Sequence, residues 1–77
     1  MTLEDLISNT TLQGDIRIST FVSVHCQDIE NVLKVIHGTE QLRLCDIEES
    51  WYNCEVYYMF CGNDGYLHIE IETPEVE

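Results

Sequence analysis

The most regular pattern in this chain is an alternation of apolar and polar side chains that begins at Asp15. Apolar or β-branched residues stand at every second position, at Ile16, Ile18, Thr20, Val22 and Val24. Successive side chains of a strand point to opposite faces, so a period of two residues indicates one buried face. The pattern therefore predicts a half-buried strand over residues 15–24.

The first residues predict a short helix that ends at Asn9. Thr2 is a good N-cap residue, and Asp5 follows it three positions later, as in a capping box. Three apolar residues then fall on one side of the helix: Leu3, Leu6 and Ile7. We expect this side to lie across a sheet, because an amphipathic helix buries its apolar stripe.

The middle of the chain predicts a second strand and a second short helix. Residues 25–30 are polar and acidic and favour a turn, whereas the β-branched run over residues 31–37 is strand-like. Further on, Asp46 followed three positions later by Glu49 fits an acidic N-cap. We expect one or two helical turns there, carrying Trp51.

The last third predicts a β-hairpin with strands over residues 55–61 and 66–72. The residues between them, Gly-Asn-Asp-Gly at 62–65, are all turn formers. Antiparallel pairing across this loop sets three apolar pairs on one face, which we expect to face the core. These pairs are Val56 with Ile71, Tyr58 with Ile69, and Phe60 with Leu67. The other face then holds Glu55 beside Glu72, two like charges that folding does not require.

Together these elements predict a single two-layer α+β domain over residues 1–77. We expect the N-terminal helix to pack on an antiparallel four-stranded sheet with a C-terminal hairpin, because the connections are short enough for a meander. One helix covers only one sheet face. The second face, or an edge strand, then stays open to water or to a partner.

The chain is small and strongly acidic. Its 77 residues include 15 Asp and Glu against 3 Lys and Arg, a formal net charge of −12, while 44% are hydrophobic. That hydrophobic share predicts a folded chain and excludes a disordered acidic tail. The negative field disfavours direct binding to nucleic acid or to an anionic membrane and attracts basic partners. Because no apolar run approaches about 20 residues and the first ten residues lack a basic start, we expect a cytoplasmic protein.

The cysteines and histidines give little sign of metal or catalytic chemistry. The four cysteines, Cys26, Cys45, Cys54 and Cys61, include no close pair of the kind that zinc sites use. We expect reduced and mostly buried thiols, while two disulfides in any of three pairings, or a Cys/His zinc site, stay open as alternatives. The acids are spread out, and the neighbours His25 and Cys26 point to opposite faces if they lie on a strand, so we expect no enzyme, no catalytic residue and no cofactor.

The acidic residues fall into clusters that suit a basic partner. On one strand face, Glu70 and Glu72 lie about 7 Å apart, near the spacing of phosphates along a nucleic-acid strand. Asp28 and Glu30 form a second cluster. A third cluster lies just before the hairpin and consists of Asp46, Glu48 and Glu49. Aromatic rings nearby suit interface anchors, although Trp51 serves equally well to close the core. The candidate partner-binding residues are Asp46, Glu48, Glu49, Trp51, Glu55, Tyr57, Glu70 and Glu72.

In size, acidity and helix-then-sheet order, the whole chain resembles small acidic proteins encoded by phages and other mobile genetic elements. Residues 58–70 (YMFCGNDGYLHIE) look like the C-terminal hairpin of such proteins, among which are anti-CRISPR and anti-restriction proteins. This class resemblance assigns no individual residue. It implies an inhibitor that occupies the DNA-binding surface of a nuclease, above all the site where a CRISPR effector reads its short duplex motif with Arg side chains.

Two functions from different classes follow. The first is a non-enzymatic inhibitor that binds a basic nucleic-acid-processing protein through carboxylates that pair with Arg and Lys. As its partner we favour a CRISPR effector nuclease over a restriction enzyme. The alternative is a structural or adaptor module that associates through a sheet edge, for example as a homodimer, with acidity serving solubility. A Cys/His metal-binding regulator is a further competitor. Binding that weakens with salt favours the inhibitor, and binding indifferent to salt favours the adaptor.

Overall fold

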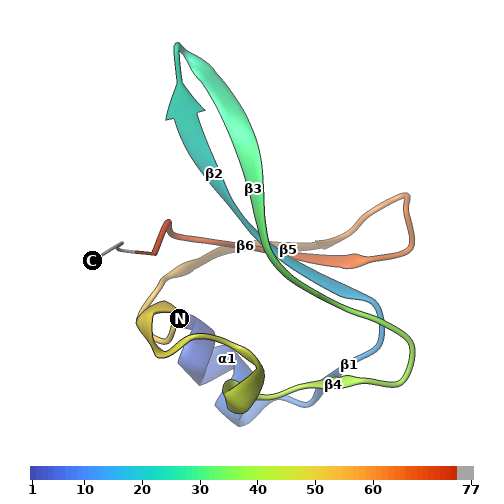
Figure 1. Cartoon of the computed structure of the whole chain (residues 1–77). Helices are drawn as coiled ribbons and strands as arrows, with labels where there is room; N and C mark the ends of the chain where they lie inside the picture. The colour runs from blue at the N-terminus through green and yellow to red at the C-terminus, as the bar shows by residue number, and fades with distance from the viewer. Residues whose placement is uncertain (75–77) are drawn as a thin grey trace.

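A computed structural model describes residues 1–74 and shows an α+β fold (Figure 1). Its elements in chain order are α1 (Leu3–Asn9), β1 (Leu12–Gln13), β2 (Ile16–Val24), β3 (Gln27–Ile36), β4 (Gln41–Leu42), the 3-10 turns η1 (Leu44–Asp46) and η2 (Glu49–Trp51), β5 (Val56–Cys61) and β6 (Leu67–Ile71). The α+β class and the N-terminal helix are confirmed. The strands form two sheets, where the sequence predicted one.

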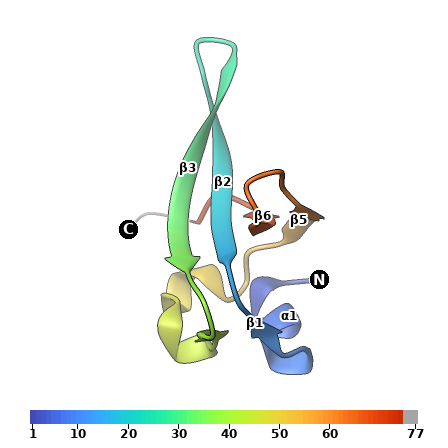
Figure 2. The same ribbon diagram turned by 90° about the vertical axis from the view of Figure 1, so that its right-hand side faces the viewer.

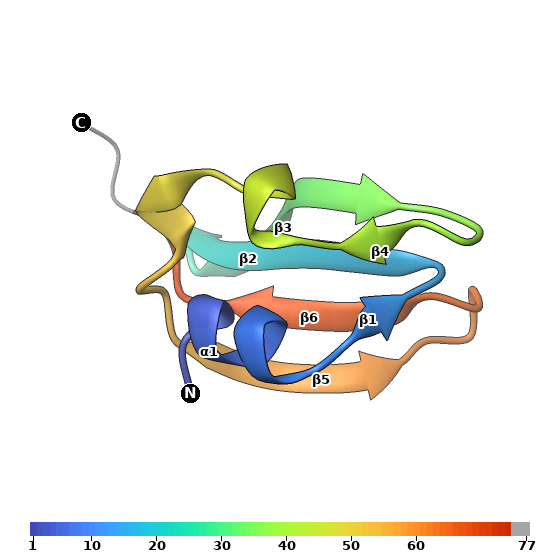
Figure 3. The same ribbon diagram turned by 90° about the horizontal axis from the view of Figure 1, so that it is seen from below.

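The larger sheet has the strand order β3-β2-β6-β5, and β1 pairs separately with β4. The β2–β3 and β5–β6 pairs are antiparallel, but β2 and β6 run parallel, with Ile16 beside Leu67 and Ser19 beside Glu70. The expected all-antiparallel meander is therefore wrong. After β3 the chain crosses the helix side of the sheet and returns as β5 at the far edge, so that β6 enters beside β2 in the same direction (Figure 3).

The core lies between one face of the larger sheet and the layer formed by α1, the small sheet and the 3-10 turns (Figures 1 and 3). The capping box is present, because Thr2 and Asp5 exchange their side-chain hydrogen bonds with each other's backbone N–H. All three apolar residues of the helix are buried, as the sequence predicted. They meet the buried residues Ile16, Ile18, Leu42, Ile69 and Ile71.

The β2–β3 hairpin is longer than the sequence predicted. Only His25 and Cys26 form the turn, both with positive φ, 51° and 65°, and β3 already begins at Gln27. Two successive residues in the left-handed region make the tight turn whose twist matches that of a hairpin. The expected turn over residues 25–30 is therefore mostly strand. Residues 21–30, all exposed, project from the body and are called the arm below (Figures 1 and 2).

The C-terminal hairpin is present, with a register that differs from the expected one near its loop. Val56 lies opposite Ile71 as expected, but a bulge follows Val56 and brings Phe60 opposite His68. One extra residue in a strand moves the following side chains to the other face. Phe60 and Tyr58 are therefore 54% and 66% exposed, and their predicted place in the core is wrong.

Between β4 and β5 the chain forms the two 3-10 turns η1 and η2 in place of the expected helix. Ile47 separates them in an extended conformation, with φ −119° and ψ 159°, and its side chain is buried. Two consecutive extended residues, Ile47 and Glu48, therefore interrupt the helix that the sequence predicted. The expectation of mostly buried thiols is also wrong, since Cys54 is buried but Cys26, Cys45 and Cys61 are exposed.

Candidate protein-binding site

A hollow of about 480 Å³ opens where the arm leaves the sheet. Asp28 and Phe21 contribute to it from the arm, and Tyr57 contributes from β5. Glu70 of β6 and Glu72, directly after that strand, complete the set. Three carboxylates and two aromatic rings thus meet at one concave surface. We call this surface the acidic hollow.

The parallel pairing of β2 with β6 builds this hollow. It sets Glu70 beside Ser19 at the point where β2 continues outward into the arm. Just beyond β6, the hydroxyl oxygens of Thr20 and Thr73 lie 2.9 Å apart and tie the chain end to β2. The carboxylates of β6 are therefore held against the base of the arm by two strands of the same sheet.

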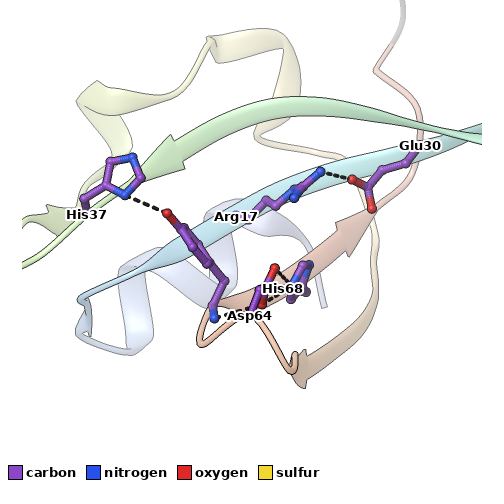
Figure 4. Close-up of polar contacts among 6 residues, drawn as sticks. Arg17, Glu30, His37, Asp64 and His68 are labelled. Carbon is purple, nitrogen blue, oxygen red and sulfur yellow. Dashed lines mark hydrogen bonds and ion pairs between the residues drawn. The ribbon is translucent and has the colours of Figure 1, made fainter.

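The positive charges of the protein lie elsewhere. Arg17 forms an ion pair with Glu30 across the β2–β3 hairpin (Figure 4), and both side chains are about one-third exposed. Lys34 and Arg43 line a second hollow of about 340 Å³. No Lys or Arg of residues 1–74 lines the acidic hollow.

The structure brings together some of the residues that the sequence singled out and separates others. Tyr57, Glu70 and Glu72 all line the acidic hollow. Glu55 is a neighbour of Glu72, whose N–H donates to the Glu55 carbonyl at 2.8 Å, as the predicted pairing requires. The Glu55 carboxylate contacts the Met1 ammonium at 3.1 Å.

The remaining candidates lie on the 3-10 segment. Asp46, Glu48 and Glu49 are exposed but do not line the acidic hollow. The Asp46 carboxylate accepts the Arg43 N–H at 3.0 Å. Trp51 is only 9% exposed and closes the core, one of the two places that the sequence left open for it.

Sequence reasoning missed Phe21 and did not include Asp28 among the partner-binding residues. A signal for Phe21 is present in the pattern, because it occupies a position where the alternation of β2 calls for a polar residue. A large apolar side chain on the polar face of a strand indicates contact outside the core.

Apolar side chains also cover the opposite face of the arm. Val22, Val24 and Ile29 are 38%, 40% and 51% exposed, and Val22 pairs with Ile29 across the hairpin. Because neighbouring strand residues alternate between faces, this apolar face lies back to back with the face that bears Phe21 and Asp28. The arm therefore offers a partner one acidic face and one apolar face.

The loop that joins β5 to β6 is fixed by its own polar contacts. Both carboxylate oxygens of Asp64 lie 3.0 Å from His68 Nε2, and one accepts the Tyr66 N–H at 3.0 Å (Figure 4). The Tyr66 hydrogen bond, followed by that of His68, lowers the pKa of Asp64. The Phe60 ring stacks on the His68 ring, with the two ring centroids 4.9 Å apart. These contacts shape the hairpin and leave the acidic hollow untouched.

Comparison of the chain with protein-family models, curated proteins and solved structures finds no match. Within residues 1–74, no helix has the length and apolar character needed to cross a membrane. The same residues contain no cluster of three or more His, Cys, Asp or Glu side chains suited to hold a metal ion.

Proposed function

We propose that the protein is a non-enzymatic inhibitor that binds a basic nucleic-acid-processing protein through the acidic hollow. The observation that carries this proposal is the convergence of Asp28, Glu70 and Glu72 on one surface that no cation of residues 1–74 lines. A chain that carries a charge of −12 attracts basic surfaces over long range, and the hollow offers them a specific place to dock.

In this mechanism, Arg and Lys side chains that normally hold DNA phosphates enter the hollow. Glu70 lies on β6, and Glu72 follows directly after the strand, two residues further along the chain and near the phosphate repeat. Both carboxylates form charge-assisted hydrogen bonds with the cations. Tyr57 and Phe21 supply aromatic faces against which a guanidinium stacks. The apolar face of the arm then packs beside the charged contacts and excludes water from them.

The partner class that we propose first is a CRISPR effector nuclease, and a restriction nuclease second. Both hold duplex DNA with basic side chains, and a CRISPR effector reads its short duplex motif with Arg residues in the major groove. The support for this choice is the resemblance of the chain to small acidic mobile-element proteins, together with the position of the carboxylates.

The experiment is a DNA-cleavage assay with purified nucleases of both kinds, titrated with the wild-type protein and two matched charge-reversal variants. One variant changes the hollow, Glu70→Lys with Glu72→Lys. The other changes the same number of charges on the 3-10 segment, Glu48→Lys with Glu49→Lys. Both alter the net charge by the same amount, so a difference between them reports position alone.

We expect the hollow variant to lose at least about tenfold in inhibitory potency, because one charge-assisted hydrogen bond contributes about 1.5–3 kcal/mol and about 1.4 kcal/mol is tenfold. The variant of the 3-10 segment should stay close to wild type. Equal losses in both would mean that only net charge matters, and unchanged inhibition by the hollow variant would refute this site.

A further inference from the structure

Strand β5 presents an edge that no other strand within residues 1–74 covers. It is the last strand in the order β3-β2-β6-β5, and β6 pairs with one side of it only. On its other side, the backbone contacts lie at its start, where the Val56 N–H donates to the Met1 carbonyl at 2.8 Å and Thr2 bridges to Glu55. The edge from Tyr57 onward faces outward.

This edge is apolar to an unusual degree. Four consecutive large side chains, Tyr57, Tyr58, Met59 and Phe60, are 54%, 66%, 47% and 54% exposed. An exposed and uncharged edge strand pairs readily with another strand, and soluble proteins usually protect such edges with charges, Pro or a covering segment. Only the bulge near Val56 interrupts β5.

The charge distribution makes the contrast sharper. The chain has 15 acidic residues among 77, yet Val56–Cys61 contains no charged residue. The opposite edge of the same sheet, β3, carries Asp28, Glu30 and Lys34 and is protected in the usual way. Negative charge is thus abundant over the molecule and absent from the strand that forms this edge of the larger sheet.

We propose that β5 is the interface between two copies of this chain, paired antiparallel about a two-fold axis into one continuous sheet. A two-fold axis brings the same strand of each copy together, so the neutral edge meets a neutral edge and like charges stay apart. Tyr58 and Met59 lie near the axis and form cross-strand apolar pairs with their counterparts, and the free backbone groups of both edges become hydrogen-bonded.

The dimer surface adjoins the acidic hollow at Tyr57, but the association it predicts has the opposite dependence on salt. Two copies that each carry a charge of −12 repel one another, so screening the repulsion strengthens the dimer. Binding of a basic partner weakens under the same conditions. The two proposals can therefore fail separately.

Sedimentation equilibrium of the full chain over a wide concentration range tests the dimer. The runs are made in about 0.1 M and about 1 M NaCl, between which the Debye length falls from about 10 Å to about 3 Å. We expect the mass to rise from 9.0 kDa towards twice that value with concentration, and the dimer to form at lower concentration in high salt.

Two variants locate the contact. Tyr58→Lys places two like charges at the axis and should remain a monomer throughout. Val35→Lys adds the same charge to the other edge, where Val35 is 36% exposed, and should associate like wild type. Circular dichroism and unfolding curves check that both variants fold, and amide exchange of β5 in wild type should slow as concentration rises.

A wild-type mass of 9.0 kDa at every concentration and salt level would overturn the proposal. So would equal effects of the two lysines, or growth beyond a dimer, since a two-fold contact closes on itself.

Discussion

Ser19 of β2 lies directly beside Glu70 of β6 in the parallel pair at the centre of the sheet. This pairing places a carboxylate of the last strand at the base of the β2–β3 arm. Asp28 of the arm and Glu72 of the chain beyond β6 line the same hollow, although they are 44 residues apart in the sequence (72 − 28). The acidic hollow is therefore a property of strand order and exists only in the folded chain.

The helix cap makes a first prediction about stability. In Thr2→Ala, the Asp5 N–H loses its side-chain acceptor, so the free energy of unfolding should fall by about 1 kcal/mol. Urea unfolding followed by circular dichroism measures the change. Ser8→Ala, at an exposed position of the same helix, is the matched control and should have no comparable cost. Equal effects of the two substitutions would show that the cap does not stabilise the fold.

The register of the C-terminal hairpin makes a second prediction. Ile69 is fully buried, so Ile69→Val should lower the free energy of unfolding by about 0.5–1.5 kcal/mol. Tyr58 is 66% exposed, so Tyr58→Thr, which keeps a strand-forming residue, should change it by less than about 0.5 kcal/mol. Urea unfolding at low protein concentration compares both with wild type. A larger loss for Tyr58→Thr would restore the core position that the sequence suggested.

The β5–β6 loop makes a prediction about pH. The pKa of Asp64 is lowered from its ordinary value of 3.8, mainly because its carboxylate accepts the Tyr66 N–H. A lowered pKa means that the contribution of Asp64 to stability is fully present above pH 3.8 and is lost as pH falls through the lowered value. A carboxyl NMR titration should find the Asp64 midpoint below 3.8. A midpoint at or above that value would contradict the hydrogen bonds described here.

Gly62 offers an independent test of the same contact. A Cβ at this position would lie 2.6 Å from His68 Nε2 and 2.7 Å from an Asp64 oxygen, closer than such atoms can approach. In Gly62→Ala the side chains of His68 and Asp64 must therefore shift from their present contact, and we expect the pKa of Asp64 to rise towards its ordinary value. The same NMR titration of the variant measures this. An unchanged midpoint would mean that the His68 contact does not affect the pKa of Asp64.

The features that the sequence predicted are those set by neighbouring residues. The Thr2–Asp5 capping box, the alternation of β2 and the turn residues of the C-terminal hairpin each lie within a few positions of one another. The sequence predicts too long a turn between β2 and β3. The actual turn uses His25 and Cys26, whereas glycine or asparagine usually occupies such positive-φ positions.

The features that the sequence did not predict depend on distant parts of the chain. No local pattern shows that β6 lies parallel to β2. The two strands become neighbours because the chain makes a long crossover after β3. Strand spacing alone predicted that Glu70 and Glu72 lie close together. That Asp28 lines the same hollow could be predicted only with the strand order known. The bulge beside Val56 likewise has no glycine to mark it, and it alone moves Tyr58 and Phe60 to the outer face.

The proposed function requires that the acidic hollow occupies the DNA site of a basic nuclease. The test uses a nuclease that this protein inhibits in the cleavage assay. A labelled duplex is first bound to that nuclease, the protein is then titrated in, and fluorescence anisotropy follows the release of the duplex. We predict complete displacement of the DNA, with an apparent inhibition constant that rises linearly with the duplex concentration, as competition for one site requires. A ternary complex, in which the duplex stays bound at saturating amounts of this protein, would show that the acidic hollow does not occupy the DNA site.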